Sequence, residues 1–199
     1  MGSSKMISLG RPEIDQSAFI DPMASVLGNV FIGEGVYVAP HASLRADEPG
    51  SSIIIEGHCN VQDNVVIHAL RDSVVRVGAS STLAHGCIVH GPCEIGKRCF
   101  IGFGSVLFHC SLLDDSAVMH RALVTNAVIP SSRMVASGAI IEAPVEMSDL
   151  IEIPQETRRF IDSAHEINVQ LAHAYNSESS SLDFPRTMGN QEGLNWTKR

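Results

Sequence analysis

The stretch VGASSTLAHGCIVHGPCEIGKRCFIG (residues 77–102) has an aliphatic residue at every sixth position. These residues are Val77, Leu83, Val89, Ile95 and Ile101. A period of six fits neither the 3.6-residue turn of an α-helix nor a meander of strands with turn-rich spacers. It is typical of a parallel β-helix, in which each hexad forms one short strand and one corner and the aliphatic side chains stack inside.

The same period extends over most of the chain on both sides of this stretch. Its other members are Ile20, Val26, Ile32, Val38, Leu44, Ile55, Val61, Ile67, Leu107, Leu113, Met119, Ile129, Val135 and Ile141. We therefore expect a β-helix over residues 14–142. The pattern resembles the hexapeptide-repeat, left-handed β-helix superfamily, and this resemblance implies a triangular prism whose coil takes three hexads, or about 18 residues.

Two breaks in the period predict loops that project from the prism. Leu44 and Ile55 are separated by eleven positions, so five residues are extra there. Ile67 and Val77 are separated by ten positions, so four are extra. Both breaks adjoin polar residues, and insertions beside a rigid scaffold are common places for functional groups.

Beyond residue 142 the six-residue period ends. Pro144 and Pro154 mark a linker over residues 143–154. Residues 155–175 show helical spacing and predict an amphipathic helix that lies along the prism; its expected apolar positions are Phe160, Ala164, Ile167, Leu171 and Tyr175. Residues 1–13 form an N-terminal extension, and the Ser- and Asn-rich residues 176–199 predict a disordered tail. The expected fold is an all-β left-handed parallel β-helix with a C-terminal α-helix.

Composition and charge limit the kinds of partner. The chain has 199 residues, a net charge of −8, 44% hydrophobic residues and 18% charged residues. This charge argues against a nucleic-acid groove and against an anionic membrane surface.

The five cysteines form no C-x-x-C pair and indicate reduced, buried thiols. The start MGSSKMISLG lacks the apolar core of a signal peptide, and no apolar run reaches the length of a membrane span. We expect a cytoplasmic protein.

Two histidines fall at the same position of their hexads. His68 follows Ile67 and His90 follows Val89, and the two are one coil apart once the extra residues are set aside. They should lie about 4.8 Å from each other, the spacing of neighbouring strands. Imidazoles stacked in this way can bind one metal ion. The same count one coil earlier places Arg45 in this column.

A third histidine, His85, falls on a neighbouring face of the prism. It occupies the third position of the Leu83 hexad, and Asp63 fills the same slot one coil earlier, with Gln62 beside it. A rigid prism does not bring His85 onto a metal held by His68 and His90 of its own chain. A neighbouring chain can, so we expect a homotrimer in which each metal site is completed by His85 of the next subunit.

The remaining histidines are interpreted as solvated or satisfied structural residues. They are His41, His58, His109, His120, His165 and His173.

Three segments give the chain a more specific resemblance. RADE (residues 45–48), NVQDNVVIHAL (residues 60–70) and LAHGCIVHGP (residues 83–92) resemble the gamma-class carbonic anhydrases. The resemblance implies a lyase, a carbonate dehydratase, that hydrates carbon dioxide to bicarbonate by a metal-bound hydroxide at a trimer interface. It also implies that the metal ligands are His68, His85 and His90, with Zn²⁺ as the ion and Fe²⁺ or Co²⁺ as alternatives.

The resemblance assigns roles to further residues. Arg45 and Asp63 match an intersubunit ion pair, and Asp47 matches another interface carboxylate. Gln62 matches a residue that orients the hydroxide, Glu48 an acidic residue near the active-site water, and Asn168 an asparagine that holds carbon dioxide or bicarbonate. The column count adds two aromatic residues that continue above His90 and His85, namely Phe108 and Phe103. Two interpretations remain open for them: an apolar wall for a nonpolar gas, or ordinary packing residues at a subunit interface.

The sequence departs from the best-known type of this family at two positions. Arg71 stands where that type has a proton-shuttling glutamate, in a loop that is short here. Glu166 stands where it has a tyrosine two residues before the helix asparagine. The chain therefore resembles the type without the acidic loop, and we expect a low rate in which Glu48, Asp72 or buffer exports the proton.

Two other functions remain open. One is a different hexapeptide-repeat enzyme, an acyltransferase or a metal-dependent acyl-CoA thioesterase, for which the same nucleophile would serve. The other is a non-catalytic metal-binding assembly subunit.

Overall fold

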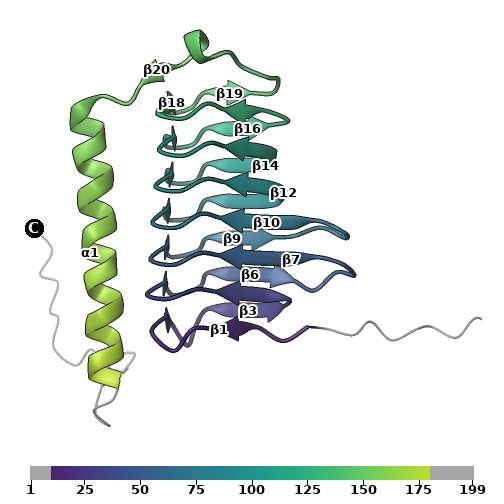
Figure 1. Ribbon diagram of the computed structural model, residues 1–199, viewed down its shortest axis with the longest axis vertical. Coiled ribbons are helices and arrows are strands. Elements are labelled where there is room, and N and C mark those ends of the chain that lie inside the picture. Colours follow the sequence, from purple (N-terminus) through teal and green to yellow (C-terminus); the bar gives the residue numbers. More distant parts are fainter. Residues whose placement is uncertain (1–9, 180–199) are drawn as a thin grey trace, which may run out of the picture.

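The computed structural model describes residues 10–179 of the chain. These residues form a left-handed parallel β-helix of about seven turns with one C-terminal helix, as the sequence predicted. The prism has three faces, and the helix stands beside one of them along its long axis (Figure 1).

We call the face beneath the helix the helix face. Its parallel strands are β2 (Phe19–Ile20), β5 (Tyr37–Val38), β8 (Asn60–Val61), β11 (Thr82–Leu83), β13 (Phe100–Ile101), β15 (Ala117–Val118) and β18 (Arg133–Val135). A short strand, β20 (Ile151–Glu152), pairs antiparallel with β18 and closes this sheet at the last turn.

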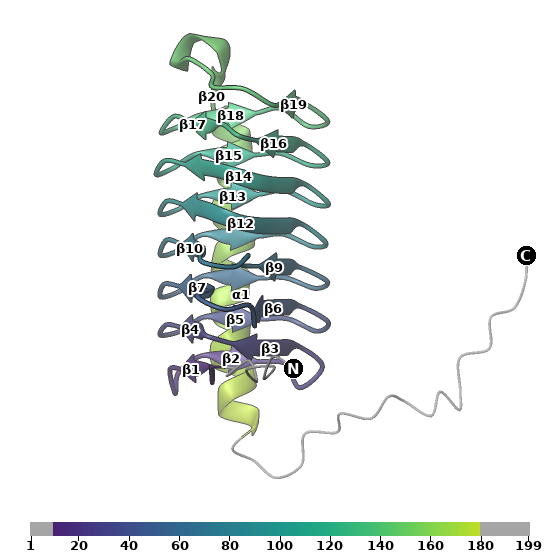
Figure 2. The same ribbon diagram turned by 90° about the vertical axis from the view of Figure 1, so that its right-hand side faces the viewer.

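The next face along the chain is called the histidine face. Its strands are β3 (Ser25–Gly28), β6 (Ser43–Ala46), β9 (Val66–His68), the first halves of β12 (Ile88–Ile95) and β14 (Val106–Leu112), β16 (Leu123–Thr125) and β19 (Ile140–Ile141). Its edge is on the right of Figure 2.

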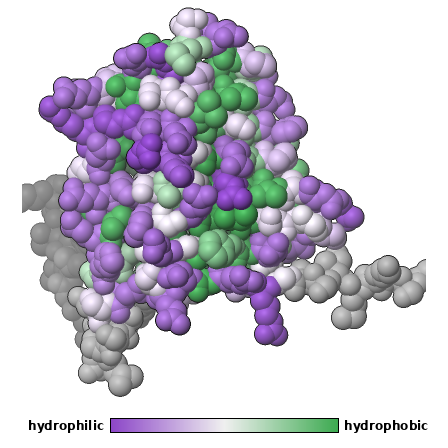
Figure 3. All heavy atoms as spheres, in the orientation of Figure 1, coloured by the Kyte–Doolittle hydropathy of each residue, from purple (hydrophilic) through white to green (hydrophobic). Residues whose placement is uncertain are grey.

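The third face is called the front face because it faces the viewer in Figure 1. Its strands are β1 (Glu13–Ile14), β4 (Val30–Ile32), β7 (Ser52–Ile55), β10 (Val74–Val77), the second halves of β12 and β14, and β17 (Val128–Ile129). Figure 3 shows a vertical band of apolar side chains on this face, interrupted by hydrophilic ones. Exposed apolar side chains here include Phe31, Val74 and Val128.

Stacking of inward aliphatic side chains explains why such short strands are stable. Along β10 and β12 exposed and buried residues alternate, as the two-residue period of a strand requires. Leu44, Ile67 and Val89, one from each of three successive coils of the histidine face, are 0% exposed. A strand of two to four residues has too little surface to fold alone, so each coil is stabilised by its neighbours.

Left-handed backbone conformations recur at two corners of the prism. The corner between the helix face and the histidine face is turned by a residue with positive φ in every coil after the first, namely His41, Asn64, Gly86, Gly104, Arg121 and Gly138, and the corner between the front face and the helix face is turned in the same way by Gly35, His58, Ser80, Arg98, Asp115 and Ser132. Gly86 has φ +69°, and a Cβ placed there would meet nothing within 4 Å, so glycine is favoured by its conformation and not by lack of space.

The sequence prediction of the inward positions is wrong in one coil. The count placed Leu113 and Met119 inside, but Leu113 is 47% exposed and the inward residues are Leu112 and Val118, at 1% and 0%. One residue is missing between Leu107 and the next inward position, and two adjacent leucines concealed the change. The predicted series resumes correctly at Ile129 and Val135, which are both fully buried.

The segment after the prism differs in its boundaries from the prediction. The expected linker 143–154 contains a 3₁₀ helix, η1 (Met147–Asp149), as well as β20. The helix α1 (Gln155–Ser179) continues four residues beyond the expected end at 175, so only residues 180–199 of the expected tail lie outside the described part. Residues 1–9 of the N-terminal extension also lie outside it.

Helix α1 packs on the helix face, with a contact stripe that matches the predicted one at Leu171 and Tyr175 and differs from it elsewhere. Ile161 packs against Phe100 and is 5% exposed, whereas Ile167, expected to face the prism, is 54% exposed. Farther along, the ring of Tyr175 stacks on Phe19, with centroids 4.8 Å apart. Within the described residues, no helix combines the length and apolar character needed to cross a membrane.

An ion pair links two adjacent coils beside this helix. Arg98 Nε and Nη2 donate to the two carboxylate oxygens of Asp115, both at 2.7 Å. The hydrogen bond from Arg98 lowers the pKa of Asp115 below its usual value of 3.8. Because the folded pKa is depressed, the pair stabilises the fold above the unfolded pKa, and this contribution is lost as the pH falls through the folded value.

We therefore expect Arg98→Gln to destabilise the protein at pH 7 and to have progressively less effect as the pH falls below about 4. Urea denaturation of both proteins at neutral and acidic pH measures this difference. An unchanged difference across the range would contradict an electrostatic role for the pair. Both side chains are partly exposed, so the effect at pH 7 is expected to be small.

Candidate metal centre

Two histidines meet on the histidine face. His68 ends β9, His90 lies in β12, and the two are register partners on adjacent parallel strands. His68 Nδ1 and His90 Nε2 are 3.2 Å apart, and the ring planes make an angle of 76°. Arg45 of β6 is the register partner of His68, so the predicted column of Arg45, His68 and His90 is present.

Each imidazole retains a nitrogen without a hydrogen-bond partner. His68 Nε2 and His90 Nδ1 are buried and make no hydrogen bond in the described residues. Glu48 Oε1 lies 3.4 Å from His68 Nε2, within ion-pair distance but without the geometry of a hydrogen bond. Buried polar nitrogens are usually satisfied, so this pair of rings is incomplete as a purely structural arrangement.

The facing nitrogens fit a shared metal ion. Two imidazole nitrogens bound at about 2.05 Å to a tetrahedral ion would lie roughly 3.3 Å apart, and the observed separation is 3.2 Å. Neutral imidazoles suit zinc, iron and cobalt, and this donor set does not choose among them.

Acidic side chains reach this pair from the first of the two inserted loops, which project at the right of Figure 1. Asp47 and Glu48 lie in the loop between β6 and β7, and the next loop lies against it. The backbone N–H of Arg71 donates to Glu48 Oε2 at 2.8 Å. His68 Nε2 is 3.9 Å from Asp47 Oδ1. The first insertion thus places two carboxylates beside His68.

Arg45 pairs with Asp47 in its own chain, with Nη2 and Oδ2 3.0 Å apart. The sequence resemblance assigned Arg45 to Asp63 of another subunit instead. Within one chain, Asp63 is 3.0 Å from His85 Nδ1. The described chain therefore has two separate pairs, Arg45 with Asp47 and His85 with Asp63.

His85 lies at the corner between the helix face and the histidine face. Its backbone N–H donates to Gln62 Oε1 at 3.2 Å, and Gln62 is only 6% exposed. The His85 side chain is 54% exposed. Its ring lies against Phe103, with centroids 5.5 Å apart. This second column of Asp63, His85 and Phe103 follows the predicted count.

The structure does not bring His85 onto the His68–His90 pair within one chain. No group of three or more His, Cys, Asp or Glu residues in the described range is arranged to hold a metal ion. Phe108 lies above His90, with ring centroids 5.5 Å apart, and both Phe108 and Phe103 are about two-fifths exposed. Asn168 is half-buried on α1, and its Nδ2 donates to Ala164 O of the same helix at 2.7 Å.

One neighbour of the His85 column was missed in the sequence. The ring of His120 stacks on Phe103 with centroids 4.4 Å apart, and His120 Nδ1 accepts the N–H of Phe103 at 3.1 Å. Burial lowers the pKa of His120, which favours the neutral ring that this hydrogen bond requires. Counted from the inward residue Val118, His120 has the same hexad position as His85. The count had placed Met119 inward instead of Val118, so it did not assign His120 to this column.

Comparisons with known proteins support the hexapeptide-repeat fold. Residues 75–109 match the family model described as Bacterial transferase hexapeptide (six repeats). The chain is 33% identical to a carbonic anhydrase of Methanosarcina thermophila over 84% of this chain and 76% of that protein. It is 35% identical to the carboxysome assembly protein CcmM of Nostoc sp., over 84% of this chain and 32% of CcmM, so it spans about a third of that relative's length.

A solved structure of similar shape supports the fold alone. The hexapeptide transferase family protein of Anaplasma phagocytophilum superposes with a TM-score of 0.61 at 22% identity, over 82% of this chain and 92% of that one.

Proposed function

Because the chain belongs to the hexapeptide-repeat family that includes the M. thermophila carbonic anhydrase, we propose that it hydrates carbon dioxide to bicarbonate at metal sites shared between the chains of a homotrimer. Each site would be formed by His68 and His90 of one chain and His85 of the next. The observation on which this proposal depends is the pair of facing imidazole nitrogens at 3.2 Å, each ring with its other nitrogen unpartnered.

A second copy of the chain supplies the missing ligand in this proposal. His85 and the His68–His90 pair lie at opposite edges of the histidine face, so three such faces around a three-fold axis bring one edge to the next. The same face exposes apolar side chains that a subunit interface would bury. They include Leu27, Val66, Ile88, Phe108 and Ile140.

A divalent metal ion bound by three imidazoles supplies Lewis-acid activation of water near neutral pH. Side chains of the chain itself would orient the substrate and shape the site. Gln62 Oε1 is engaged by the backbone of His85, which leaves its Nε2 to donate to an oxygen of the substrate. Phe103 and Phe108 provide an apolar surface that accepts carbon dioxide and excludes water from its approach.

Proton export falls to Glu48 in this site. Glu48 Oε1 lies 3.4 Å from His68 Nε2, at the rim formed by the inserted loops, and its other oxygen is held by the N–H of Arg71. A carboxylate held by one oxygen keeps the other available to accept and release a proton. Arg71 itself is always charged and cannot serve as a proton carrier, so we expect slow proton export and strong acceleration by buffer.

The similarity to CcmM supports a second candidate, a non-catalytic assembly role. The matched part of CcmM corresponds to 84% of this chain. In that case the metal would stabilise a docking module, and the chain would bind a large partner without turnover.

The test is carbon dioxide hydration by protein prepared without oxygen and loaded with Zn²⁺, Fe²⁺ or Co²⁺. We expect a rate above that of buffer, its loss on chelation and its recovery when the metal is restored. Acyl-CoA hydrolysis is measured in parallel. A fully metallated trimer with a hydration rate equal to buffer would rule out the proposal, and acyl-CoA hydrolysis by that trimer would favour the thioesterase instead.

Gln62→Ala separates catalysis from metal binding. Because Gln62 is not a ligand, we expect the metal content to remain and the kcat/KM for hydration to fall roughly 100-fold, as for loss of one positioned hydrogen-bond donor. An equal loss of metal and rate would instead assign Gln62 to holding His85 in place.

A further inference from the structure

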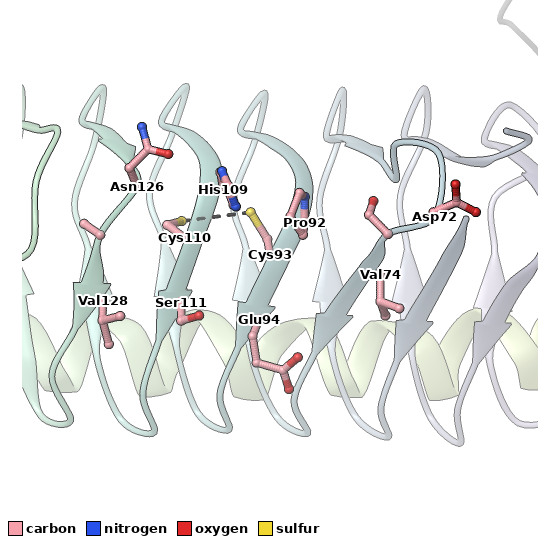
Figure 4. A pocket seen from close by; sticks show the side chains of 12 residues that line it. Asp72, Val74, Pro92, Cys93, Glu94, His109, Cys110, Ser111, Asn126 and Val128 are labelled. Atoms are coloured by element: carbon pink, nitrogen blue, oxygen red, sulfur yellow. Dashed lines mark hydrogen bonds between the residues drawn. The ribbon is translucent and has the colours of Figure 1, made fainter. Parts of the chain in front are cut away.

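Two cysteines lie together at the floor of a pocket outside the histidine site. Cys93 of β12 and Cys110 of β14 line a pocket of about 680 Å³ at the corner between the histidine face and the front face. Figure 4 shows the two sulfur atoms pointing toward one another between adjacent strands. The pocket is also lined by Pro92, Glu94, His109, Ser111 and Val128.

Register and distance suit a bond between these two sulfur atoms. Cys93 and Cys110 are register partners on parallel strands, and their Sγ atoms are 3.9 Å apart. Register partners on neighbouring strands have Cα atoms about 4.8 Å apart, which lies within the range of about 4.4–6.8 Å found for disulfides. The sulfur atoms need to approach by roughly 2 Å, a movement that side-chain rotation provides.

The other three cysteines lack such a partner. Cys59 Sγ donates to Gly78 O at 3.2 Å and Cys99 Sγ to Leu113 O at 3.3 Å. Cys87 is fully buried, and burial raises the pKa of its thiol. The chain therefore has one close pair of thiols beside a pocket and three single thiols that serve as internal controls.

We propose that Cys93 and Cys110 form a redox-sensitive dithiol site that exchanges with small-molecule disulfides. One thiol, after losing its proton to solvent, attacks a sulfur of the small disulfide, breaks its S–S bond and expels one small thiolate. The second protein thiol then attacks the mixed disulfide and expels the other. Two protein thiols are oxidised to one disulfide, and one small disulfide is reduced to two small thiols.

The pocket provides the space that this exchange needs. Cys93 and Cys110 are only 3% and 5% exposed, so a reagent reaches them from the pocket side and not through the core. The resulting disulfide would join the two strands that hold His90 and Phe108. This modification requires neither a metal nor turnover, so it stands apart from the proposed enzymatic function.

The test treats the folded, full-length protein with oxidised glutathione and counts its thiols by alkylation after denaturation. We expect two of the five thiols to be lost with a mass decrease of two hydrogen atoms. Peptide mapping without reductant should find one peptide that joins Cys93 to Cys110, and dithiothreitol should restore all five thiols.

Three variants make the result specific. Cys93→Ala and Cys110→Ala should each abolish the paired loss, whereas Cys87→Ala, an equal truncation in the core, should keep it. Five intact thiols in the treated wild-type protein, a link between other cysteines or a link between chains would each overturn the proposal. The wild-type count decides the question even if a variant fails to fold.

Discussion

Mixing His85→Ala chains with His90→Ala chains should restore metal to about a quarter of the sites, although each variant alone binds none. In the proposed trimer a site takes His90 from one chain and His85 from the next. In an equal, random mixture, half the chains keep His90 and half of their neighbours keep His85. The measurement is metal content per chain after the two variants are unfolded and reassembled together.

A matched mixture provides the control. His68→Ala and His90→Ala remove two ligands that the same chain supplies, so no combination of these variants completes a site. Removal of His85 should leave the prism folded because its side chain is 54% exposed, and circular dichroism checks this. Equal recovery in both mixtures, or no recovery in the first, would mean that the sites do not join His85 of one chain to His90 of another.

Leu112→Ala should reduce the free energy of unfolding by about 2–5 kcal/mol, whereas Leu113→Ala should change it by no more than about 0.5 kcal/mol. The two substitutions delete the same atoms from adjacent residues. Leu112 is 1% exposed in the stacked core and Leu113 is 47% exposed, so only the first leaves a cavity. Urea denaturation at one fixed chain concentration measures both, since oligomer stability depends on concentration.

A larger loss of stability for Leu113→Ala than for Leu112→Ala would mean that Leu113 faces inward, as the six-residue count places it. Equal, small effects would mean that this coil contributes little to stability. Val118→Ala provides a further check, since Val118 is fully buried in the coil that follows and the count had assigned that place to Met119.

Most of the fold is predictable because its geometry repeats. Stacked coils place residues of equal hexad position one above another, so counting alone brought His68 under His90 and Asp63 under His85. The count failed where one residue is missing between Leu107 and Leu112 and two adjacent leucines offer alternative inward positions, and it omitted the buried Val124, from which Ile129 is only five positions away. A local pattern cannot choose between Leu112 and Leu113, because burial depends on the register with the neighbouring coil.

The contacts of long side chains were less predictable than the stacking of residues of equal hexad position. Arg45 reaches Asp47, two residues away, and nothing in the hexad position distinguishes this carboxylate from Asp63 on another face. The choice of which α1 residues face the prism was ambiguous in a similar way. Phe160 and Ile161 are adjacent apolar residues, and rotation of the helix by one residue decides that Ile161 is buried and Ile167 exposed.

The return of α1 along the prism has a consequence for how the molecule unfolds. In a linear stack each coil contacts only its neighbours, so the outermost coils are expected to fray independently of the middle. Here the helix begins beside the last turns and ends beside the first (Figure 1). The ring of Tyr175 on this helix stacks on Phe19 in the first coil, and Ile161 packs against Phe100 near the centre. The helix thus links distant turns to one another, and opening of either end disrupts packing over the whole length, which should make unfolding more cooperative than in a bare solenoid.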